Sequence, residues 1–357
     1  MKKIRLLATI LATGILSVSL TAGCGKAETV KAAGAEESAV TEETETAAVE
    51  EAVAAEEVTA TENTAEDDIV VRIGQLSGHL LPVVALEKGY FEEEGVKAEL
   101  FTLGGGPAEI EAYTAGELDI IETGDLPFLN GISNGLDLHV IGTYSNSTKV
   151  NGLVATVDSG IKNYEDLKGK RLAVPFGTNI QALLYQYLEL GGLTPDDAEI
   201  LNLSNPDAVN ALASGDIDAA VLWNPHLGKA AALENTVLIS NTDEIRTFVC
   251  PISTSQQFID EHHDTVGKVL RALNKASEFS KTNPEEAAQI VNDYYGLDSV
   301  DSILSELGLT DNSVPLTEEK INALREGFAA NYKYGLIENE YNIDDFIYAE
   351  FSDELSK

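Results

Sequence analysis

The pattern of apolar and polar positions between residues 68 and 295 alternates short apolar runs with longer stripes. Each run is typical of a buried strand, and the runs lie at 68–76, 97–102, 118–122, 138–143, 152–157, 171–174, 199–203, 218–222 and 236–239. The segments between them carry apolar residues three and four positions apart, as in Leu183/Tyr187 and Leu184/Leu188, which predicts helices. This alternation of strand and helix predicts an α/β fold.

One segment of the chain, Ala112–Phe128, has a similar partner, Ala211–Leu227, which begins 99 residues later. In both, an apolar-striped helix ends near a glycine and a short strand follows. A polar turn with a nearby proline then begins the next helix. Two copies are too few for a repeat array, which needs at least about three units. The repetition therefore predicts two similar α/β lobes.

The polar turns that follow the strands are expected to meet in a cleft between the lobes. In parallel α/β sheets, ligands bind beyond the carboxyl ends of the strands, where helix N-termini point. A small oxyanion is well served there by backbone N–H groups and hydroxyls, without an arginine. The candidate ligand-binding residues are Ser77, Gly78, His79, Thr123, Gly124, Asp125, Gly177, Thr178, Asn179, Trp223 and Asn224.

Each of these candidates also has a simpler interpretation. The Thr, Asp and Asn side chains are good helix caps whether or not they contact a ligand. Trp223 would serve either as an apolar wall for the body of the ligand or in packing between the lobes. His79 would be either a neutral hydrogen-bond donor at the edge of the cleft or a plain surface residue.

The N-terminal 68 residues predict export, anchoring and a tether. Residues 1–24 begin with basic residues, continue with a mostly apolar stretch, and end in LTAGC. This end resembles a bacterial lipobox, in which the cysteine, here Cys24, is lipidated, so that two acyl chains anchor the protein to the cell membrane. Residues 25–68 are mainly Ala, Glu, Thr and Val and predict a disordered acidic tether, with a helical alternative for the Ala/Glu stretches.

The acidic composition and the cysteine content narrow the function. Of the net charge of −37, residues 27–68 contribute −13, from 14 acidic residues and one base. The remainder is still acidic, so nucleic acid is not an expected partner, because phosphate contacts need Lys and Arg surfaces. With Cys24 acylated, Cys250 has no disulfide partner, and its apolar strand predicts a buried, inert thiol.

Several segments carry a family resemblance, namely SGHLLP (77–82), EKGYFEEEGV (87–96), 104–142, 161–179, ASGDIDAAVLWNPH (213–226) and NPEEAAQIV (283–291). In this order and spacing they resemble the substrate-binding component of ABC transporters of the aliphatic sulfonate, taurine and nitrate type. That group shares its fold with the pyrimidine-precursor-binding proteins. The TGD-x-P and W-x-P turns resemble the sulfonate branch, which usually has an acid where this chain has Asn224.

The resemblance implies a two-lobed, periplasmic-binding-protein-like (type II) fold with two mixed sheets flanked by helices. Lobe 1 is expected to comprise 69–152 plus 250–357, and lobe 2 is expected to comprise 153–249. The chain is expected to return to lobe 1 near Arg246–Ser253, and the C-terminal helices at 257–282, 284–295, 298–307, 317–335 and 344–355 should pack on that lobe. Two segments, near 144–157 and 244–252, would then form the hinge.

The implied function is that of an extracytoplasmic, monomeric solute-binding lipoprotein. It would capture a small organic anion and deliver it to an ABC permease and its ATPase. Binding of nitrate, taurine or a pyrimidine precursor remains an alternative, as does a solute sensor that presents its closed form to a receptor. Because Asn224 replaces the usual acid, an anion without an obligatory amine, such as an alkyl or aryl sulfonate, is favoured over taurine.

The sequence predicts neither catalysis, nor a cofactor, nor a metal site. No Ser/His/Asp or Cys/His set can be assigned, and the yeast-type pyrimidine synthase of this fold class carries a cysteine-rich motif that this chain lacks. Gly104–Gly106 lacks the GxGxxG spacing of a dinucleotide site and predicts a tight strand–helix turn. His262 and His263 are adjacent on a predicted helix and therefore do not share a face for one metal ion.

Overall fold

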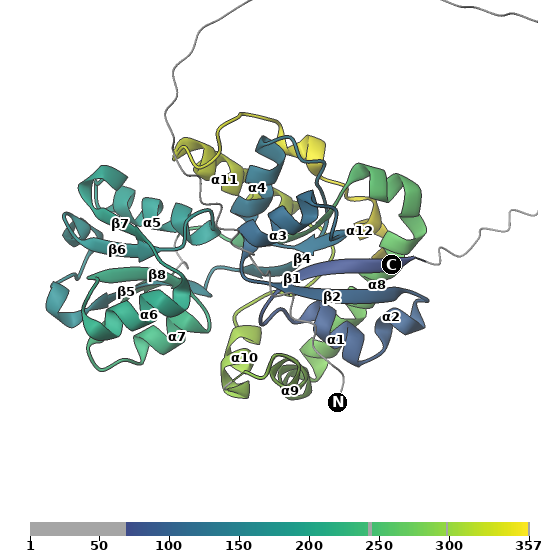
Figure 1. Ribbon diagram of the computed structural model, residues 1–357, viewed down its shortest axis with the longest axis horizontal. Helices are drawn as coiled ribbons and strands as arrows, with labels where there is room; N and C mark the ends of the chain where they lie inside the picture. Colours follow the sequence, from purple (N-terminus) through teal and green to yellow (C-terminus); the bar gives the residue numbers. More distant parts are fainter. Residues whose placement is uncertain (1–68, 242–244, 298, 356–357) are drawn as a thin grey trace, which may run out of the picture. The chain divides into compact units, whose positions relative to one another are not determined.

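Two mixed sheets form the framework of the protein in this computed structural model, which describes residues 69–241, 245–297 and 299–355 (Figure 1). The predicted signal peptide, Cys24 and the predicted tether lie outside these residues. The first sheet has the order β2-β1-β3-β10-β4, with β1 (Val70–Leu76), β2 (Lys97–Leu103), β3 (Ile120–Glu122), β4 (His139–Ser147) and β10 (Phe248–Thr254). Strands β1, β2 and β3 are parallel, whereas β10 runs antiparallel between β3 and β4.

The second sheet has the order β7-β6-β8-β5-β9. Its strands are β5 (Asn151–Thr156), β6 (Arg171–Val174), β7 (Glu199–Asn202), β8 (Ala219–Trp223) and β9 (Thr236–Asn241). Strands β6, β7 and β8 are parallel, and β5 is antiparallel to both of its neighbours, β8 and β9. The chain passes from the first sheet to the second between β4 and β5, and it returns between β9 and β10.

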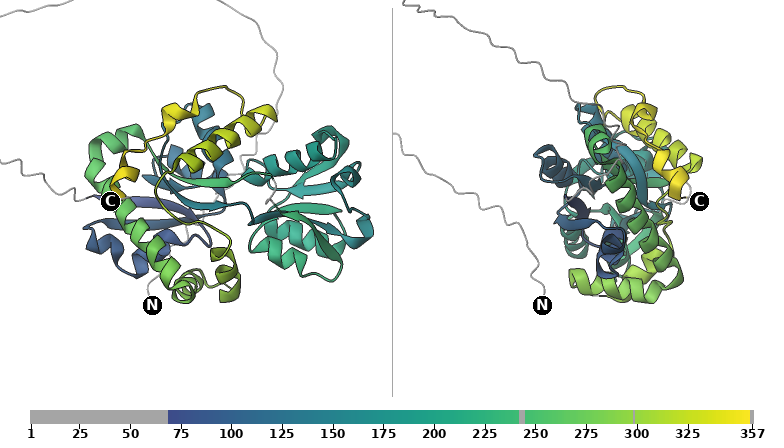
Figure 2. Two further views of the ribbon diagram at one scale, coloured as in Figure 1. Left: turned by 180° about the vertical axis from the view of Figure 1, so that it is seen from behind. Right: turned by 90° about the vertical axis from the view of Figure 1, so that its right-hand side faces the viewer.

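Helices cover both faces of each sheet, so apolar side chains are buried on both sides of the strands. On the first sheet, which with its helices is called lobe 1, the helices are α1 (Leu81–Glu87), α2 (Tyr90–Glu93), α3 (Gly106–Thr114), α4 (Asp125–Ser133), α8 (Gln256–Thr282), α9 (Pro284–Tyr295), α10 (Val300–Leu307), α11 (Glu318–Lys333) and α12 (Glu350–Leu355). Core contacts place α1, α8, α9 and α10 on one face and α4 and α11 on the other, as Figure 2 shows from behind.

The second sheet and its helices are called lobe 2. One of its faces is covered by α5 (Asn179–Leu190), and the other by α6 (Asn205–Ser214) and α7 (His226–Ala231). Of the largest side chains in its core, Tyr187 is fully buried and stacks on Tyr164 with ring centroids 5.2 Å apart.

The repeated segment seen in the sequence has the same contacts in both lobes. Asp119 accepts hydrogen bonds from the backbone N and from Nε of Arg72, at 2.7 and 3.0 Å. Asp218 accepts the equivalent bonds from Arg171, at 2.8 and 3.3 Å. In each lobe the arginine also donates to a carbonyl of the preceding turn, that of Gly116 in lobe 1. The acidic residue that follows the glycine turn therefore fixes the start of the neighbouring parallel strand.

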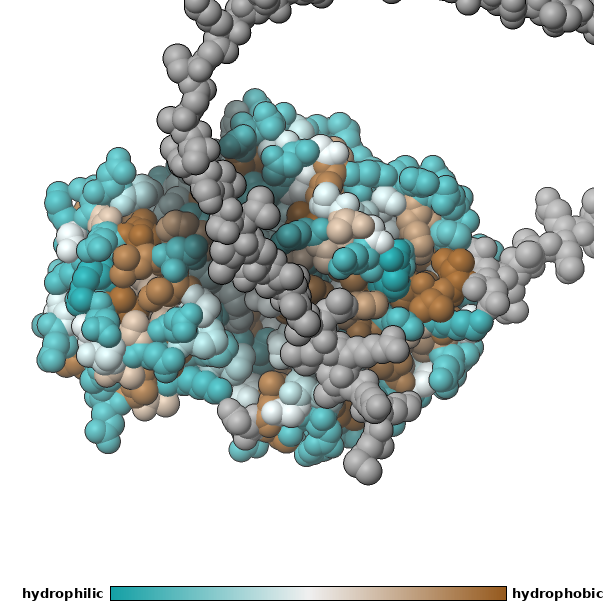
Figure 3. All heavy atoms as spheres, viewed as in Figure 1, coloured by the Kyte–Doolittle hydropathy of each residue, from teal (hydrophilic) through white to brown (hydrophobic). Residues whose placement is uncertain are grey.

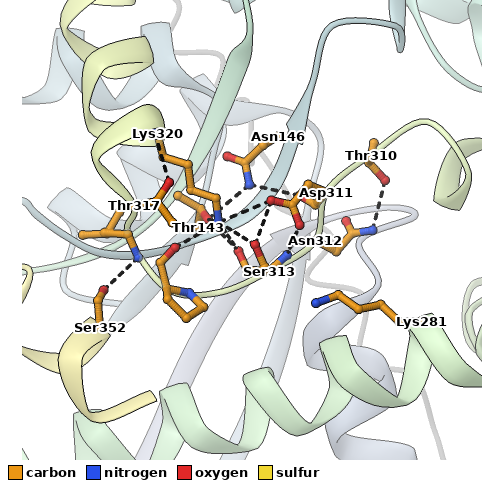
Figure 4. Close-up of polar contacts among 12 residues, drawn as sticks. Thr143, Asn146, Lys281, Thr310, Asp311, Asn312, Ser313, Thr317, Lys320 and Ser352 are labelled. Atoms are coloured by element: carbon orange, nitrogen blue, oxygen red, sulfur yellow. Dashed lines mark hydrogen bonds and ion pairs between the residues drawn. The ribbon is translucent and has the colours of Figure 1, made fainter. Parts of the chain in front are cut away.

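The connection from α10 to α11 lies along the free edge of β4. Asn146 and Asp311 exchange backbone hydrogen bonds of 2.9 and 2.8 Å. Lys320 of α11 holds this connection in place, because its buried ammonium donates to Thr143 Oγ1, to the carbonyls of Ser313 and Pro315 and to Ser313 Oγ at 2.6–3.0 Å (Figure 4). The connection between α10 and α11 is thus held against β4 of lobe 1.

The predicted helix at 344–355 is wrong in its first half. The structure has a short 3₁₀ turn at Ile343–Phe346, and α12 begins only at Glu350. Between them Ile347 is extended, and the Tyr348 N–H donates to the Val140 carbonyl at 2.9 Å. The backbone of this segment pairs with the edge of β4, which a local helical pattern does not anticipate.

The surface drawn in Figure 3 is largely hydrophilic, with separate apolar patches. The most exposed large apolar side chains of the described residues include Val157, Leu190 and Leu238 of lobe 2, whose exposed fractions are 58%, 56% and 45%. Within the same residues, no helix combines the length and the apolarity needed to cross a membrane.

Candidate functional site

A cavity of about 620 Å³ lies between the lobes, at the carboxyl ends of the parallel strands of both sheets. Its volume is within the range of roughly 300–1,000 Å³ that is typical of small-molecule sites. Eight of the eleven candidate residues line it, namely Ser77, Gly78, His79, Gly124, Thr178, Asn179, Trp223 and Asn224. The other three do not line it: Thr123 and Asp125 are buried, and Gly177 is partly exposed.

The turn after β1 presents a neutral histidine to the cavity. Gly78 has φ +95°, which favours glycine, and it lets the chain turn from β1 into α1. The Leu76 N–H donates to His79 Nδ1 at 3.3 Å, and the ring packs on Tyr144 with centroids 4.3 Å apart. Burial lowers the pKa of His79 to about 3. The ring is therefore uncharged at neutral pH, and its proton lies on Nε2.

Two buried glutamates lie beneath this turn. Glu122 Oε2 is 3.3 Å from His79 Nδ1, and Glu109 is likewise fully buried at the start of α3. Burial raises the pKa of both carboxyl groups well above the usual range. Burial therefore favours the neutral form of both carboxyl groups.

The glycine-rich segment before α3 acts as a close-packed turn, in agreement with its predicted role. Gly106 lines the cavity, and a Cβ at this position would lie 2.4 Å from Pro127 and 2.7 Å from Thr123 Oγ1. Any larger residue would push α3 away from α4. The fully buried Thr123 is thus part of the support for the site, beneath Gly124.

The structure places Asp125 in a buried ion pair. Its Oδ2 is 2.8 Å from Arg246 Nη1, with side-chain exposed fractions of 2% and 3%, and its Oδ1 accepts the Leu126 N–H at 2.7 Å. The guanidinium also lies over the ring of Phe248, 4.1 Å from its centroid. This arginine, at the return crossing between the lobes, was not among the candidate residues. Asp125 contributes through it to the packing behind the cavity.

The lobe 2 turn before α5 has internal hydrogen bonds that hold its shape. The Gly177 N–H donates to Gln181 Oε1 at 2.8 Å, and Thr178 Oγ1 donates to the Pro175 carbonyl at 2.7 Å. A Cβ added to Gly124 would lie 3.9 Å from Asn179 Oδ1. The N-termini of α4 and α5 therefore meet from opposite lobes at one end of the cavity.

On the other side of lobe 2, Trp223 ends β8 and Asn224 follows it, and both line the cavity together with Lys229. The Asn224–Pro225 peptide bond is cis. Asn224 Oδ1 accepts the N–H of Gly228 in the first turn of α7 at 3.3 Å.

Several lining residues were not found from the sequence. They are the hinge-side residues Tyr144, Ser145, Ser147, Val150 and Asn151, and Ser299, Ser302, Ile303, Ser305 and Glu306 on and before α10. The prediction placed this helix against lobe 1 without a cleft face. The serines at 299, 302 and 305 recur at a spacing of three, which marks one small polar face and was the available signal.

The prediction that Cys250 is buried is wrong, because the residue is partly exposed and lines the cavity. Burial nevertheless raises the pKa of its thiol to about 12. The thiol is protonated at neutral pH and is therefore a poor nucleophile. In the part of the chain that the structure describes, no group of three His, Cys, Asp or Glu side chains is arranged to hold a metal ion.

Residues 77–287 match the NMT1/THI5-like family. The chain is 29% identical over 289 residues to a Bacillus subtilis (strain 168) protein that is assigned by name to aliphatic sulfonate binding, with 78% of this chain and 85% of that protein covered. The structure of this chain is similar to that of the periplasmic aliphatic sulphonate binding protein SsuA from Escherichia coli. The TM-score is 0.71 and the identity 22%, with 78% of this chain and 92% of that chain covered.

The desulfurization enzyme DSZB is also similar in structure, with a TM-score of 0.62, 15% identity, and 80% of this chain and 98% of the enzyme covered. At such identities both structures show the fold alone, and they confirm the predicted two-lobed, periplasmic-binding-protein-like fold. Because one is a binding protein and the other an enzyme, the fold by itself does not separate the two classes. The family match spans more than half of the sequence, and the chain belongs to the NMT1/THI5-like family.

Proposed function

We propose that this protein is an extracytoplasmic solute-binding protein that captures a small organic anion of the aliphatic sulfonate type and delivers it to an ABC importer. The observation that carries the proposal is the meeting of the N-termini of α4 and α5 at one end of the interlobe cavity. The positive ends of two helix dipoles favour an anionic head group there. The names of the relatives support a sulfonate as that group.

The remaining walls suit an apolar ligand body. Trp223 and Phe248 supply aromatic faces, and Leu76, Val150 and Ile303 supply aliphatic ones. Such a body would be desolvated on binding, at a gain of about 25 cal/mol per Å² of apolar surface. A bare inorganic anion such as nitrate would leave these walls unfilled.

A thermal-shift panel tests the proposal. The compounds are alkylsulfonates, taurine, nitrate, a carboxylated aromatic and a pyrimidine precursor. A ligand that binds only the folded state stabilises it by about 2.7 kcal/mol at a concentration 100 times its dissociation constant. The sulfonates of the panel, with or without an amine, should raise the melting temperature most. A shift with the pyrimidine precursor alone would move the function to that branch of the fold.

The two lobes, at 69–152 plus 250–357 and 153–249, are proposed to close on the ligand about the two crossing segments. Small-angle scattering should then show compaction when a binding sulfonate is added. An unchanged scattering curve with a ligand that binds calorimetrically would refute closure.

The same proposal includes a lipid anchor at Cys24, with the tether at 25–68 between membrane and lobes. Cys24→Ser should abolish lipidation and release the protein from membranes, which fractionation measures. Membrane retention of the variant with its signal removed would contradict the anchor. The permease and its ATPase are the proposed partners of the monomeric, liganded protein.

A catalytic role is the second candidate, since an enzyme shares the fold. The pKa of the Cys250 thiol is raised to about 12, and the pKa of His79 is lowered to about 3, which makes its ring a weak base; both argue against a nucleophile–base pair at this site. We therefore infer a binding function. Unchanged recovery of a bound sulfonate after prolonged incubation, followed by mass spectrometry, separates the two.

A further inference from the structure

The side of the cavity formed by α10 differs in character from the apolar walls. Ser302, Ser305 and Glu306 line it, together with Thr310 and Asn312 from the connection that follows the helix. On the other side of α10, Val300 and Leu304 pack against the lobe 1 core, which fixes how the helix is turned. The polar side chains are therefore directed to the cavity by the packing of the helix.

Glu306 is an unusual residue in this wall. Its side chain is half-buried beside Ile303 and Leu307, and within the described residues its carboxyl group makes no hydrogen bond and no ion pair. Burial raises the pKa of this carboxyl group to about 7, because little water reaches it. A carboxylate with restricted hydration and no partner is costly, so such a group in a cleft indicates a partner that arrives with the ligand.

We propose that Glu306 is a specificity-determining residue that pairs with a cationic group on the ligand, at the end away from its anionic head. The proposal rests on the proposed function and names its substrate class as zwitterionic sulfonates whose ammonium group reaches the α10 wall. It differs from recognition of an ammonium by Asp125, because the carboxylate of Asp125 is already paired with Arg246 behind the cavity.

Within the described residues, the other titratable groups near this part of the cavity include His79 on the β1 turn with Glu122 beneath it, Tyr144 on β4, Lys229 on α7, Cys250 on β10 and Tyr295 on α9. Burial keeps His79 neutral, and burial raises the pKa values of Tyr144, Cys250 and Tyr295, which stay protonated at pH 6–8. Lys229 lies on the opposite lobe. Ionisation of Glu306 therefore changes the charge of the α10 wall between acid and neutral pH.

The test compares two matched ligand series with the purified protein by isothermal titration calorimetry. One series is ω-aminoalkanesulfonates of increasing chain length, beginning with taurine, and the other is n-alkanesulfonates of the same lengths. Both keep their charges between about pH 6 and 8, because the amine titrates near the pKa of lysine. An ammonium pairs with the ionised carboxylate, so affinity for the amino series should rise as the pH increases through about 7.

In the Glu306→Gln variant, the best aminoalkanesulfonate should bind about tenfold more weakly or worse at about pH 8, and its pH dependence should disappear. The alkanesulfonates should change less than about threefold in the same variant. Glu306→Asp should retain the pH dependence. Asp301→Asn, which removes an exposed carboxyl group from the same helix, is the matched control and should match wild type.

The outcomes distinguish failure of the Glu306 proposal from failure of the proposed sulfonate-binding function. Equal losses for both series, or pH dependence with the amine-free series, would overturn the role of Glu306 while leaving sulfonate binding intact. The second result would indicate instead that Glu306 meets Lys229 when the lobes close. Absence of binding by either series would overturn the proposed function and this inference with it.

Discussion

Asp125→Asn should destabilise the fold strongly while leaving the binding of an amine-free sulfonate nearly unchanged. The carboxylate lies 2.8 Å from the guanidinium of Arg246, and both side chains are at least 97% buried. At an effective dielectric constant of about 20, two charges at this distance attract by about 6 kcal/mol. Much of this attraction offsets the desolvation of both ions, so the pair itself adds little net stability.

Removing one partner lowers the stability much more than the pair adds to it, because the other ion is left buried without compensation. Asp125→Asn would leave the guanidinium beneath α11, where a Cβ on Gly327 would come within 2.7 Å of Arg246 Nη1, so there is no room for a side chain or water there. The expected loss is about 3–5 kcal/mol. The bond to the Leu126 N–H does not contribute to this loss, because the asparagine oxygen can still accept it.

Urea unfolding of a double-mutant cycle measures this effect. Asp125→Asn and Arg246→Met should each cost about 3–5 kcal/mol, and the double variant should cost at least about 2 kcal/mol less than their sum. Asp207→Asn, an exposed acid in the first turn of α6, is the matched control and should cost under about 1 kcal/mol. A loss below about 1 kcal/mol for Asp125→Asn, or additive losses, would refute the buried-pair reasoning.

Three further predictions follow from other groups. Because burial raises the pKa of Glu122, the folded state keeps a proton that the unfolded chain releases above about pH 4.5, so stability should fall as pH rises, by up to about 1.4 kcal/mol per unit. Glu122→Gln should flatten this slope in urea unfolding at about pH 5 and 8, and an unchanged slope would contradict it. Lys320→Met should cost about 2–4 kcal/mol, since it leaves several buried acceptors unpaired, and a loss under about 1 kcal/mol in the same assay would count against this role. Thr178→Ala should weaken alkylsulfonate binding about tenfold in calorimetry, and an equal affinity would remove Thr178 from the site.

The local parts of the fold and of the site were accessible from the sequence. Glycine turns, strand lengths and proline positions are set within a few residues, which is why the repeated segment identified both Asp119 and Asp218 correctly as equivalent positions. The turns at 77–79 and 178–179 were found because ligands in this architecture meet the carboxyl ends of strands.

The features that the sequence did not predict depend on contacts between residues far apart in the chain. Arg246 is separated from Asp125 by 121 positions, and no local pattern links a polar turn to an arginine in a crossing segment. The spacing of the serines marks a polar face of α10, but that this face points to the cavity depends on the packing of the helix against the core. The extended segment at Ile347 likewise exists because β4 offers a free edge.

The position of β10 has a consequence for how the chain is assembled. The strands of lobe 2 come from the continuous stretch 151–241, whereas lobe 1 needs β10 between β3 and β4, so that Ile252 pairs with Glu122 from 130 residues earlier. Contacts of such sequence separation form slowly, since a long loop must close before they can stabilise anything. When the chain emerges N-terminus first, β3 and β4 must wait with unpaired edges while lobe 2 folds between them. The strands of lobe 2 can thus all pair before β10 is made, whereas the first sheet is complete only once β10 has entered it.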